Sequence, residues 1–209
     1  SEAYSQRGKS YESLKNYDAA IKDLRKAVEL NPKDDSAYLS LGVIYEYEKE
    51  NHILALESFK KIIELRPEDG LGYESCAHVY HSIKDYNNAI VYYSKAIDIN
   101  RKDLALYYFR AKNYEKIGNY EQAIKDYTKI IEIQPYIEAY YNRGNAYGRL
   151  GNYEQAIRDY NKVIELNPNL SVAYSNRGSA YAMTGNFKEA IKNFDKYIQL
   201  VPNDAIAYQ

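Results

Sequence analysis

Apolar and polar positions repeat roughly every 34 residues along the whole chain. One column of the repeat holds a tyrosine in every unit, and a second column seven residues later holds tyrosine as well. The first column consists of Tyr4, Tyr38, Tyr73, Tyr107, Tyr140, Tyr174 and Tyr208, and the second of Tyr11, Tyr45, Tyr80, Tyr114, Tyr147 and Tyr181. Self-similarity at such a period indicates stacked supersecondary units rather than a single globular core.

Two further columns hold small residues. They consist of Gly8, Gly42, Ala77, Ala111, Gly144 and Gly178, and of Ala20, Ala55, Ala89, Ala123, Ala156 and Ala190. We expect them where the two helices of a unit approach each other. Tyrosines then fill the space between units, because each ring buries a large apolar area while its hydroxyl finds a polar partner. Two columns of the second helix complete this framework: Tyr17, Tyr86, Tyr120 and Tyr153, then Tyr93, Tyr127 and Tyr160.

Each unit reads as two amphipathic helices. In the fifth unit, helical spacing of apolar residues predicts a first helix over 137–150. Gly151 then supplies a left-handed residue, and Asn152 is the expected N-cap of the second helix. That helix must stop at Pro168, because proline cannot continue the hydrogen-bond ladder.

Two details depart from the regular repeat. Arg101 replaces the proline that ends the other units, and one extra residue is expected at about 50–53, in the turn of the second unit. On the solvent side we expect i,i+4 ion pairs between glutamate and a following base. They are Glu121 with Lys125 and Glu154 with Arg158.

The order small residue, tyrosine, alanine, aromatic, alanine and proline resembles the tetratricopeptide repeat (TPR) over residues 1–204. The expected units are 1–34, 35–69, 70–103, 104–136, 137–170 and 171–204, with 205–209 opening a truncated seventh. The resemblance implies an all-α fold: a right-handed superhelical solenoid of antiparallel helix pairs, present as one array over 1–209. It also implies a concave groove that binds protein or peptide, and no catalytic chemistry.

Composition narrows the function further. Basic and acidic residues number 28 and 29, and the net charge of −1 argues against a nucleic-acid partner. A single cysteine, Cys76, excludes an internal disulfide framework and favours a reducing compartment, so we expect a cytoplasmic protein. No apolar run is long enough to span a membrane. We expect Cys76 to be a buried thiol, and no cofactor is indicated.

The resemblance also identifies groove-lining positions, which point away from the small-residue and tyrosine columns. Residues expected to bind peptide there are Tyr47, Glu74, His78, Tyr108, Phe109, Lys112, Tyr141, Asn142, Asn145 and Asn176. The aromatic members either anchor an apolar side chain of a peptide or pack on neighbouring helices and stiffen the groove. The asparagines can hold a peptide backbone, since an amide both donates and accepts, although asparagine is also common there in bacterial repeats, which these segments resemble.

Two more specific sites find little support in the sequence. The two-carboxylate clamp of chaperone-binding TPR proteins needs five basic and amide residues, and units four to six supply one of the five, Asn142. Glu74, His78 and His81 share a helical face compatible with metal ligation, but a polar groove surface explains them equally well. We expect no metal site, and no motif indicates catalysis.

Three functions stay open at this stage. The first is an interaction scaffold that binds a peptide or protein segment in its groove. The second is a regulatory or substrate-recruiting arm of an enzyme whose catalytic domain lies outside this chain. The third is a self-assembling structural repeat. The repeat begins at Ser1 and a seventh unit opens at Ala205, so we expect a fragment of a longer protein whose truncated ends could self-associate.

Overall fold

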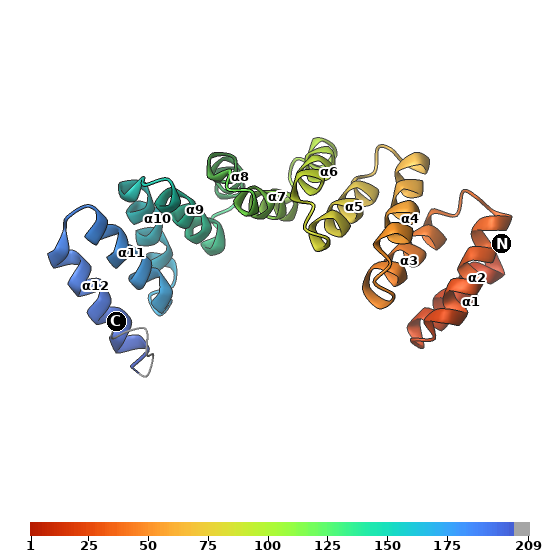
Figure 1. The fold of residues 1–209 in the computed structure, drawn as a ribbon, viewed down its shortest axis with the longest axis horizontal. Coiled ribbons are helices and arrows are strands. Elements are labelled where there is room, and N and C mark those ends of the chain that lie inside the picture. The colour runs from red at the N-terminus through yellow and green to blue at the C-terminus, as the bar shows by residue number, and fades with distance from the viewer. Residues whose placement is uncertain (203–209) are drawn as a thin grey trace. The chain divides into compact units, whose positions relative to one another are not determined.

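A computed structural model describes residues 1–202, and these residues form twelve α-helices with one π-helical turn and no strand (Figure 1). The helices are α1 (Glu2–Ser13), α2 (Tyr17–Leu30), α3 (Asp35–Val43), α4 (His52–Leu65), α5 (Gly70–Ser82), α6 (Tyr86–Ile99), α7 (Leu104–Lys116), α8 (Tyr120–Ile133), α9 (Ile137–Arg149), α10 (Tyr153–Leu166), α11 (Ser171–Met183) and α12 (Phe187–Leu200). The expected all-α class of stacked helix pairs is confirmed. The seventh unit expected at 205–209 lies outside the described residues.

The chain divides into two compact bodies, one from Ser1 to Leu106 and one from Tyr107 onward. We call them the N-terminal body and the C-terminal body and describe each by itself. In the N-terminal body each of α1 to α5 packs on the next helix along the chain, and in the C-terminal body each of α8 to α11 does the same.

Short turns of similar construction join the helices of each pair. Each turn contains one residue with a left-handed backbone: Lys15, Glu50, Lys84, Gly118, Gly151 or Gly185. The next residue is the N-cap of the second helix, and in five of the six pairs its side chain accepts a bond from a backbone N–H of the first turn. Asn152 occupies the expected cap position, but its side chain makes no such bond.

The small-residue columns lie where the helices of a pair touch. A Cβ added to Gly144 would stand 2.9 Å from the ring of Tyr160, and one added to Gly8 would stand 2.7 Å from Leu24. Contacts under 3.0 Å require a shift, so a side chain at Gly144 or Gly8 would have to displace the facing side chain of Tyr160 or Leu24. The alanine column is buried throughout, as expected.

The extra residue of the second unit lies in the first helix and not in the turn. Ile44–Glu48 forms a π-helical turn, in which the N–H of Lys49 donates to the carbonyl of Ile44 at 3.1 Å. The connection that follows has the ordinary construction, so the expectation of an inserted residue at 50–53 is wrong. The π-helical turn also places the buried carboxylate of Glu46 between His52 (2.8 Å) and Ser82 (2.5 Å).

An arginine–carboxylate pair sixteen residues apart joins the two helices in three of the pairs. The bonded residues are Arg7 with Asp23, Arg110 with Asp126 and Arg143 with Asp159, each through two hydrogen bonds. In each case the guanidinium also lies over the tyrosine of the first column, 5.5 to 5.8 Å from the ring centre. In the last pair Asn193 takes the place of the aspartate, bonded to Arg177 at 2.8 Å. The sequence pattern had not indicated this pair.

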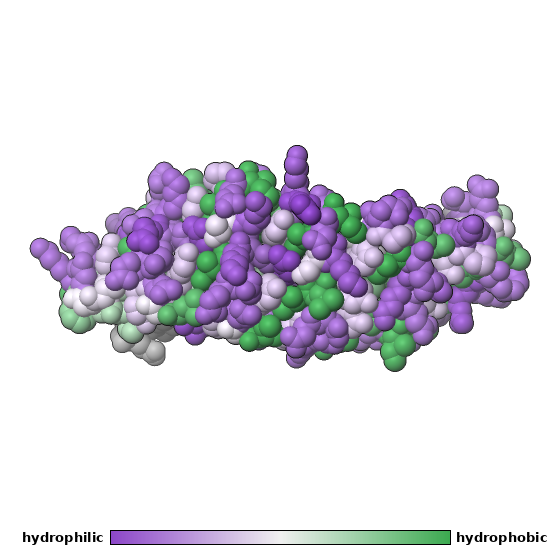
Figure 2. All heavy atoms as spheres, turned by 90° about the horizontal axis from the view of Figure 1, so that it is seen from above, coloured by the Kyte–Doolittle hydropathy of each residue, from purple (hydrophilic) through white to green (hydrophobic). Residues whose placement is uncertain are grey.

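Surface ion pairs follow a different spacing from the expected one. Ion pairs three residues apart include Lys26–Glu29, Lys61–Glu64, Lys129–Glu132 and Lys162–Glu165. Across residues 1–202, Glu121 with Lys125 and Glu154 with Arg158 form no ion pair, so that expectation is wrong. Figure 2 shows that the face in view is mostly hydrophilic, with apolar residues in separate small patches.

Candidate functional site

Three buried tyrosines send their hydroxyls from the second helix of a pair to the first. Tyr93, Tyr127 and Tyr160 belong to one framework column and are at most 4% exposed. Their hydroxyls bond His78 (3.0 Å), Glu115 (3.0 Å) and Asn145 (2.8 Å), respectively. Burial raises the pKa of all three phenols, so the hydroxyls stay protonated. These residues were expected to be core alone, but they also orient side chains on the predicted groove face.

Asn145 and Asn176 are fixed by hydrogen bonds within the C-terminal body. The Oδ1 of Asn145 accepts from the hydroxyl of Tyr160 and from Nδ2 of Asn176 at 2.9 Å. Nδ2 of Asn176 donates in addition to the hydroxyl of Tyr141 at 3.1 Å. Because the oxygen of Asn145 is used twice, its NH₂ group remains as a donor, and because the NH₂ group of Asn176 is used twice, its oxygen remains as an acceptor.

Two adjoining pockets open beside these asparagines. The asparagine pocket, of about 390 Å³, is lined by Lys112, Glu115, Lys116, Tyr120, Asn142, Asn145, Ala146, Arg149 and Asn176. The methionine pocket, of about 230 Å³, is lined by Asn145, Gly148, Arg149, Tyr153, Ala156, Tyr160, Asn176, Ser179, Ala180 and Met183. The two pockets adjoin, because Asn145, Arg149 and Asn176 line both of them. Four predicted residues thus line one pocket, while Lys116, Tyr120 and Ala146 had not been indicated.

The predicted aromatic residues of this body pack on the framework. Tyr108 is half-buried, with its ring centre 5.8 Å from that of Phe109 and 6.3 Å from that of Tyr127. Tyr141 stands 6.2 Å from Tyr160 and accepts the bond from Asn176. Packing that stiffens the groove, one of the two interpretations left open, accounts for all of these contacts.

The predicted residues of the N-terminal body, Tyr47, Glu74 and His78, lie around the buried Tyr93. Tyr47 is 66% exposed and belongs to the π-helical turn. Glu74 approaches His78 at 3.6 Å, and His78 meets the Tyr93 ring edge-on. Burial first, and then the charges of Glu74 and Tyr47, raise the pKa of the Tyr93 hydroxyl.

A search for metal ligands within the described residues finds no group of three or more histidine, cysteine, aspartate or glutamate side chains that could hold an ion. His81 instead packs on the ring of Tyr86 at 5.8 Å. Cys76 is the buried thiol that the sequence predicts, and burial raises its pKa to about 12.

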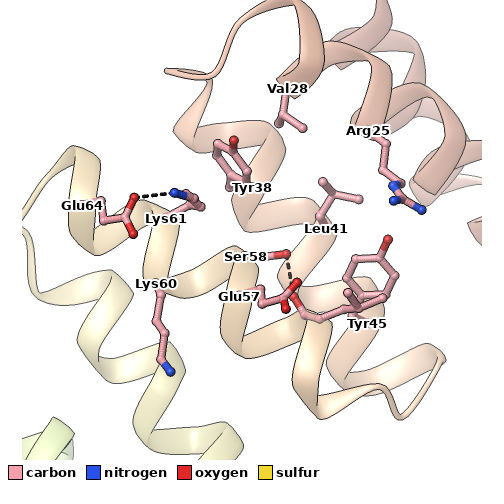
Figure 3. Close-up of a pocket in the computed structure, with 11 residues that line it drawn as sticks. Arg25, Val28, Tyr38, Leu41, Tyr45, Glu57, Ser58, Lys60, Lys61 and Glu64 are labelled. Carbon is pink, nitrogen blue, oxygen red and sulfur yellow. Dashed lines mark hydrogen bonds and ion pairs between the residues drawn. The ribbon is translucent and has the colours of Figure 1, made fainter.

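A third pocket lies where an arginine bridge is missing. In the C-terminal body, Arg143 of α9 bonds Asp159 of its own helix pair and also Thr128 of the preceding pair. The corresponding residues of the second unit are Leu41 and Ser58, and a pocket of about 400 Å³ opens there (Figure 3). It is lined by Arg25, Val28, Tyr38, Leu41, Tyr45, Leu54, Glu57, Ser58, Lys60, Lys61 and Glu64.

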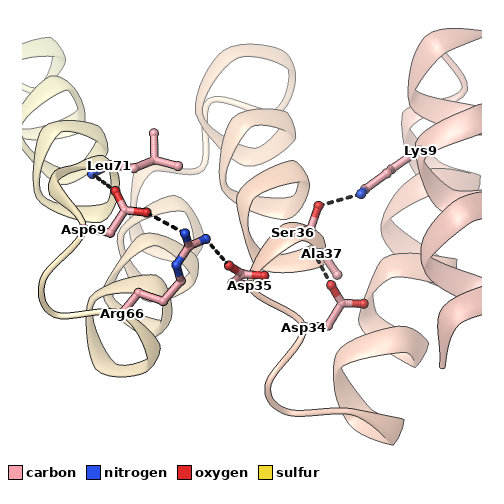
Figure 4. A network of polar contacts seen from close by, with 8 residues as sticks. All are labelled: Lys9, Asp34, Asp35, Ser36, Ala37, Arg66, Asp69 and Leu71. Carbon is pink, nitrogen blue, oxygen red and sulfur yellow. Dashed lines mark hydrogen bonds and ion pairs between the residues drawn. The ribbon is translucent and has the colours of Figure 1, made fainter.

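A polar network links successive helix pairs of the N-terminal body near the starts of α3 and α5 (Figure 4). Lys9 donates to Ser36 at 2.5 Å, and Arg66 bonds Asp35 at 2.5 Å and Asp69 at 3.0 Å. Asp34 and Asp69 also cap their helices. These bonds position backbone segments, and the residues are partly exposed, so the network reads as structural.

Solved structures of TPR proteins share this fold. MamA aligns with a TM-score of 0.74 at 25% identity, over 82% of this chain and 94% of its own. YrrB, described as a TPR protein with an unusual peptide-binding site, aligns at 0.76 and 24% identity, over 88% and 95%. The C-terminal part of a TPR repeat-containing protein from Cytophaga hutchinsonii aligns at 0.78 and 22% identity, over 94% and 79%. A search of curated proteins finds no match.

Family models of the tetratricopeptide repeat match almost the whole chain. The matched residues are 1–34, 35–69, 73–103, 104–136, 137–170 and 171–204. This fold is typically a non-catalytic interaction module, and no helix of the described residues is long and apolar enough to cross a membrane. The chain belongs to the tetratricopeptide repeat family and is a protein-interaction scaffold.

Proposed function

We propose that the C-terminal body binds an extended peptide segment along α7, α9 and α11. The observation that carries the proposal is the fixed pair Asn145 and Asn176, which presents one amide donor and one amide acceptor beside two adjoining pockets. A peptide backbone unit has one acceptor and one donor, so the pair complements it whatever the peptide's sequence.

The orientation of both amides supports the proposal because it is set before any ligand arrives. The buried Tyr160 donates a hydrogen bond to the Oδ1 of Asn145, and the same oxygen accepts a bond from the NH₂ group of Asn176, so both amides are oriented. Preorganised polar groups lose little conformational freedom on binding, and this raises affinity. The adjoining pockets provide room for the side chains on either side of the recognised backbone unit.

The test is the substitution Asn145→Asp, measured against an array of random peptides. A carboxylate still accepts from Tyr160 and Asn176 but removes the NH₂ donor, so we expect peptide affinity to fall at least about tenfold, the cost of one unmade hydrogen bond. The melting temperature should change little. Asn169→Asp, the same change at an exposed loop residue of this body, is the matched control. Unchanged binding by Asn145→Asp would refute the proposal.

A further inference from the structure

We infer that the asparagine pocket binds a carboxylate of the peptide and that the methionine pocket takes an adjacent aliphatic side chain. This inference rests on the proposed function, since it assigns a chemical preference to the same groove. It concerns residues that the sequence analysis had not selected for binding, chiefly Lys116, Arg149 and Gly148.

The charges of the asparagine pocket do not cancel. Lys112 and Glu115 pair at 2.5 Å, and the Tyr127 hydroxyl bonds the other oxygen of the Glu115 carboxylate. Glu115 is therefore already satisfied by protein groups. Lys116 and Arg149 are exposed, and within residues 1–202 neither has an ion pair, so the pocket keeps two cations without a counter-ion.

A carboxylate fits these groups better than a neutral polar group does. The guanidinium of Arg149 can donate two parallel bonds to the two oxygens of one carboxylate. Asn145 adds the NH₂ donor that its own contacts leave unused, and a carboxylate accepts several such bonds. The guanidinium of Arg149 and the NH₂ group of Asn145 can therefore both donate to the same carboxylate.

The arrangement differs from the two-carboxylate clamp. The clamp takes its basic residues from the second, fifth and sixth positions of the units, and this chain keeps one of its five residues. Lys116 and Arg149 both stand at the thirteenth position, in the last turn of α7 and α9. The carboxylate would thus lie at the C-terminal ends of these two first helices.

The methionine pocket supplies the second half of the preference. Gly148, Ala180 and Met183 contribute small or flexible apolar surface, and Met183 is 62% exposed. Methionine adapts its shape to an apolar partner. Because Asn145, Arg149 and Asn176 line both pockets, an aliphatic residue next to the acidic one would fill this space.

Gly148 provides a way to close the methionine pocket without disturbing the fold. A Cβ added there meets nothing within 4 Å, although the residue lies inside α9. Gly148→Leu should therefore fold at least as well as the wild type, since leucine favours a helix more than glycine does. Its side chain would occupy the space proposed for the ligand.

The first measurement uses the full chain on two arrays of random N-acetylated peptides, one C-terminally amidated and one with free C-termini. Enrichment of aspartate or glutamate beside an aliphatic residue in the amidated array identifies a side-chain carboxylate. Enrichment confined to the free-acid array identifies a chain terminus, and either result supports the inference. Binding that does not depend on a carboxylate overturns the inference and leaves the proposed function standing. No binding to either array overturns both.

The second measurement uses Lys116→Gln/Arg149→Gln on the selected peptides and on their amide counterparts. We expect at least about tenfold weaker binding of the acidic peptides, and little change for the counterparts. Lys125→Gln/Arg158→Gln removes the same charge from exposed positions of α8 and α10 and should bind within about twofold of the wild type. Gly148→Leu should weaken the binding of peptides that carry an aliphatic residue beside the acidic one, by a similar factor. Acidic peptides that bind both test variants as they bind the wild type would overturn the inference.

Discussion

Position by position, the arginine–aspartate pairs show how one residue's identity depends on its partner sixteen positions away. In the fifth unit Arg143 bonds Asp159, and the arginines at the same repeat position in other units bond an acceptor sixteen residues later. Where Cys76 replaces the arginine, the ring of Tyr92 stands in the partner position and packs between Tyr73 and Tyr80. A small residue opposite a large one preserves the packing, so the cysteine needs no redox or metal role.

The first prediction concerns the loss of one partner. Asp159→Ala leaves the guanidinium of Arg143, whose side chain is 16% exposed, without its carboxylate. We expect the free energy of unfolding to fall by about 3 kcal/mol, as for other buried pairs that lose one member. Asp159→Asn should cost about 1 kcal/mol, because Asn193 serves Arg177 in the same place. Urea denaturation measures both, and equal losses would contradict this account.

The second prediction concerns pH. Hydrogen bonds from Arg7 lower the pKa of Asp23 below its ordinary 3.8, whereas burial raises the pKa of Asp126 despite Arg110. The stability that Asp23 contributes is present above pH 3.8 and is lost as pH falls through its lower folded-state pKa. For Asp126 the sign reverses, and the folded state gains relative stability as pH falls toward 3.8.

The check on the pH prediction compares each wild-type–variant gap in unfolding free energy across an acid titration, with Asp23→Asn and Asp126→Asn as the non-titrating references. As the pH falls, the advantage of the wild type over Asp23→Asn should shrink below pH 3.8. The stability of the wild type relative to Asp126→Asn should instead rise as the pH falls toward 3.8 from above. Two gaps that move in the same direction would show that the two aspartates do not differ as described.

For whole helices and turns, glycine has opposite effects at two nearby positions. Gly151 has φ of +76° in a turn, and Gly148 lies inside α9, yet an added Cβ meets nothing at either. Only backbone conformation distinguishes them. We therefore predict that Gly151→Ala destabilises by about 1 kcal/mol, since left-handed backbone is costly for alanine, and that Gly148→Ala stabilises by up to about 1 kcal/mol. Thermal melts of both variants test the prediction.

The helices could be predicted well because their signals are local. Periodicity, the residue before each second helix and the following proline placed the fifth pair within a residue of the observed α9 and α10. The extra residue of the second unit was misplaced, since an insertion inside a helix leaves no glycine or proline to mark it. In the π-helical turn Glu46 bonds His52 and also Ser82, which lies 36 residues further along the chain, and periodicity does not predict a contact of that range.

The site could be predicted only in part. Groove positions came from the resemblance, and four of the predicted residues line one pocket. Lys116 stands at a groove position, the thirteenth of its unit, but no motif marked it for binding, and Tyr120 was assigned to the framework instead. The role of Tyr160 had one available signal: the chain uses tyrosine where phenylalanine would fill the same space, as Phe194 does in the last pair, and a buried hydroxyl needs a partner.

For the molecule as a whole, stability should be distributed along the chain. Each helix packs mainly on its sequence neighbours, so damage in one pair spreads little. We predict that Tyr93→Ala, which empties a fully buried site, costs about 3–5 kcal/mol locally. Hydrogen exchange should quicken in α5 and α6 and stay unchanged in α10 to α12. Uniform loss of protection over all helices would contradict this.

Self-association stays a prediction at the same scale. Phe187 and Ile191 of α12 are 66% and 61% exposed, which gives an apolar surface for contact. A mass that rises with concentration in sedimentation, and that returns to the monomer value in Phe187→Ser/Ile191→Ser, would support it. A constant monomer mass would rule out association through this face.

The π-helical turn at Ile44–Glu48 shows how the gene of a repeat protein can gain a codon while the protein still folds. A one-codon insertion inside a helix would ordinarily rotate every later side chain by about 100° and spoil the packed face. Here five residues absorb the rotation, and α4 begins with its apolar face still inward. A codon gained at the end of a first helix is therefore a mutation that this architecture tolerates, so a repeat can lengthen by one residue while the helices that follow keep their packing.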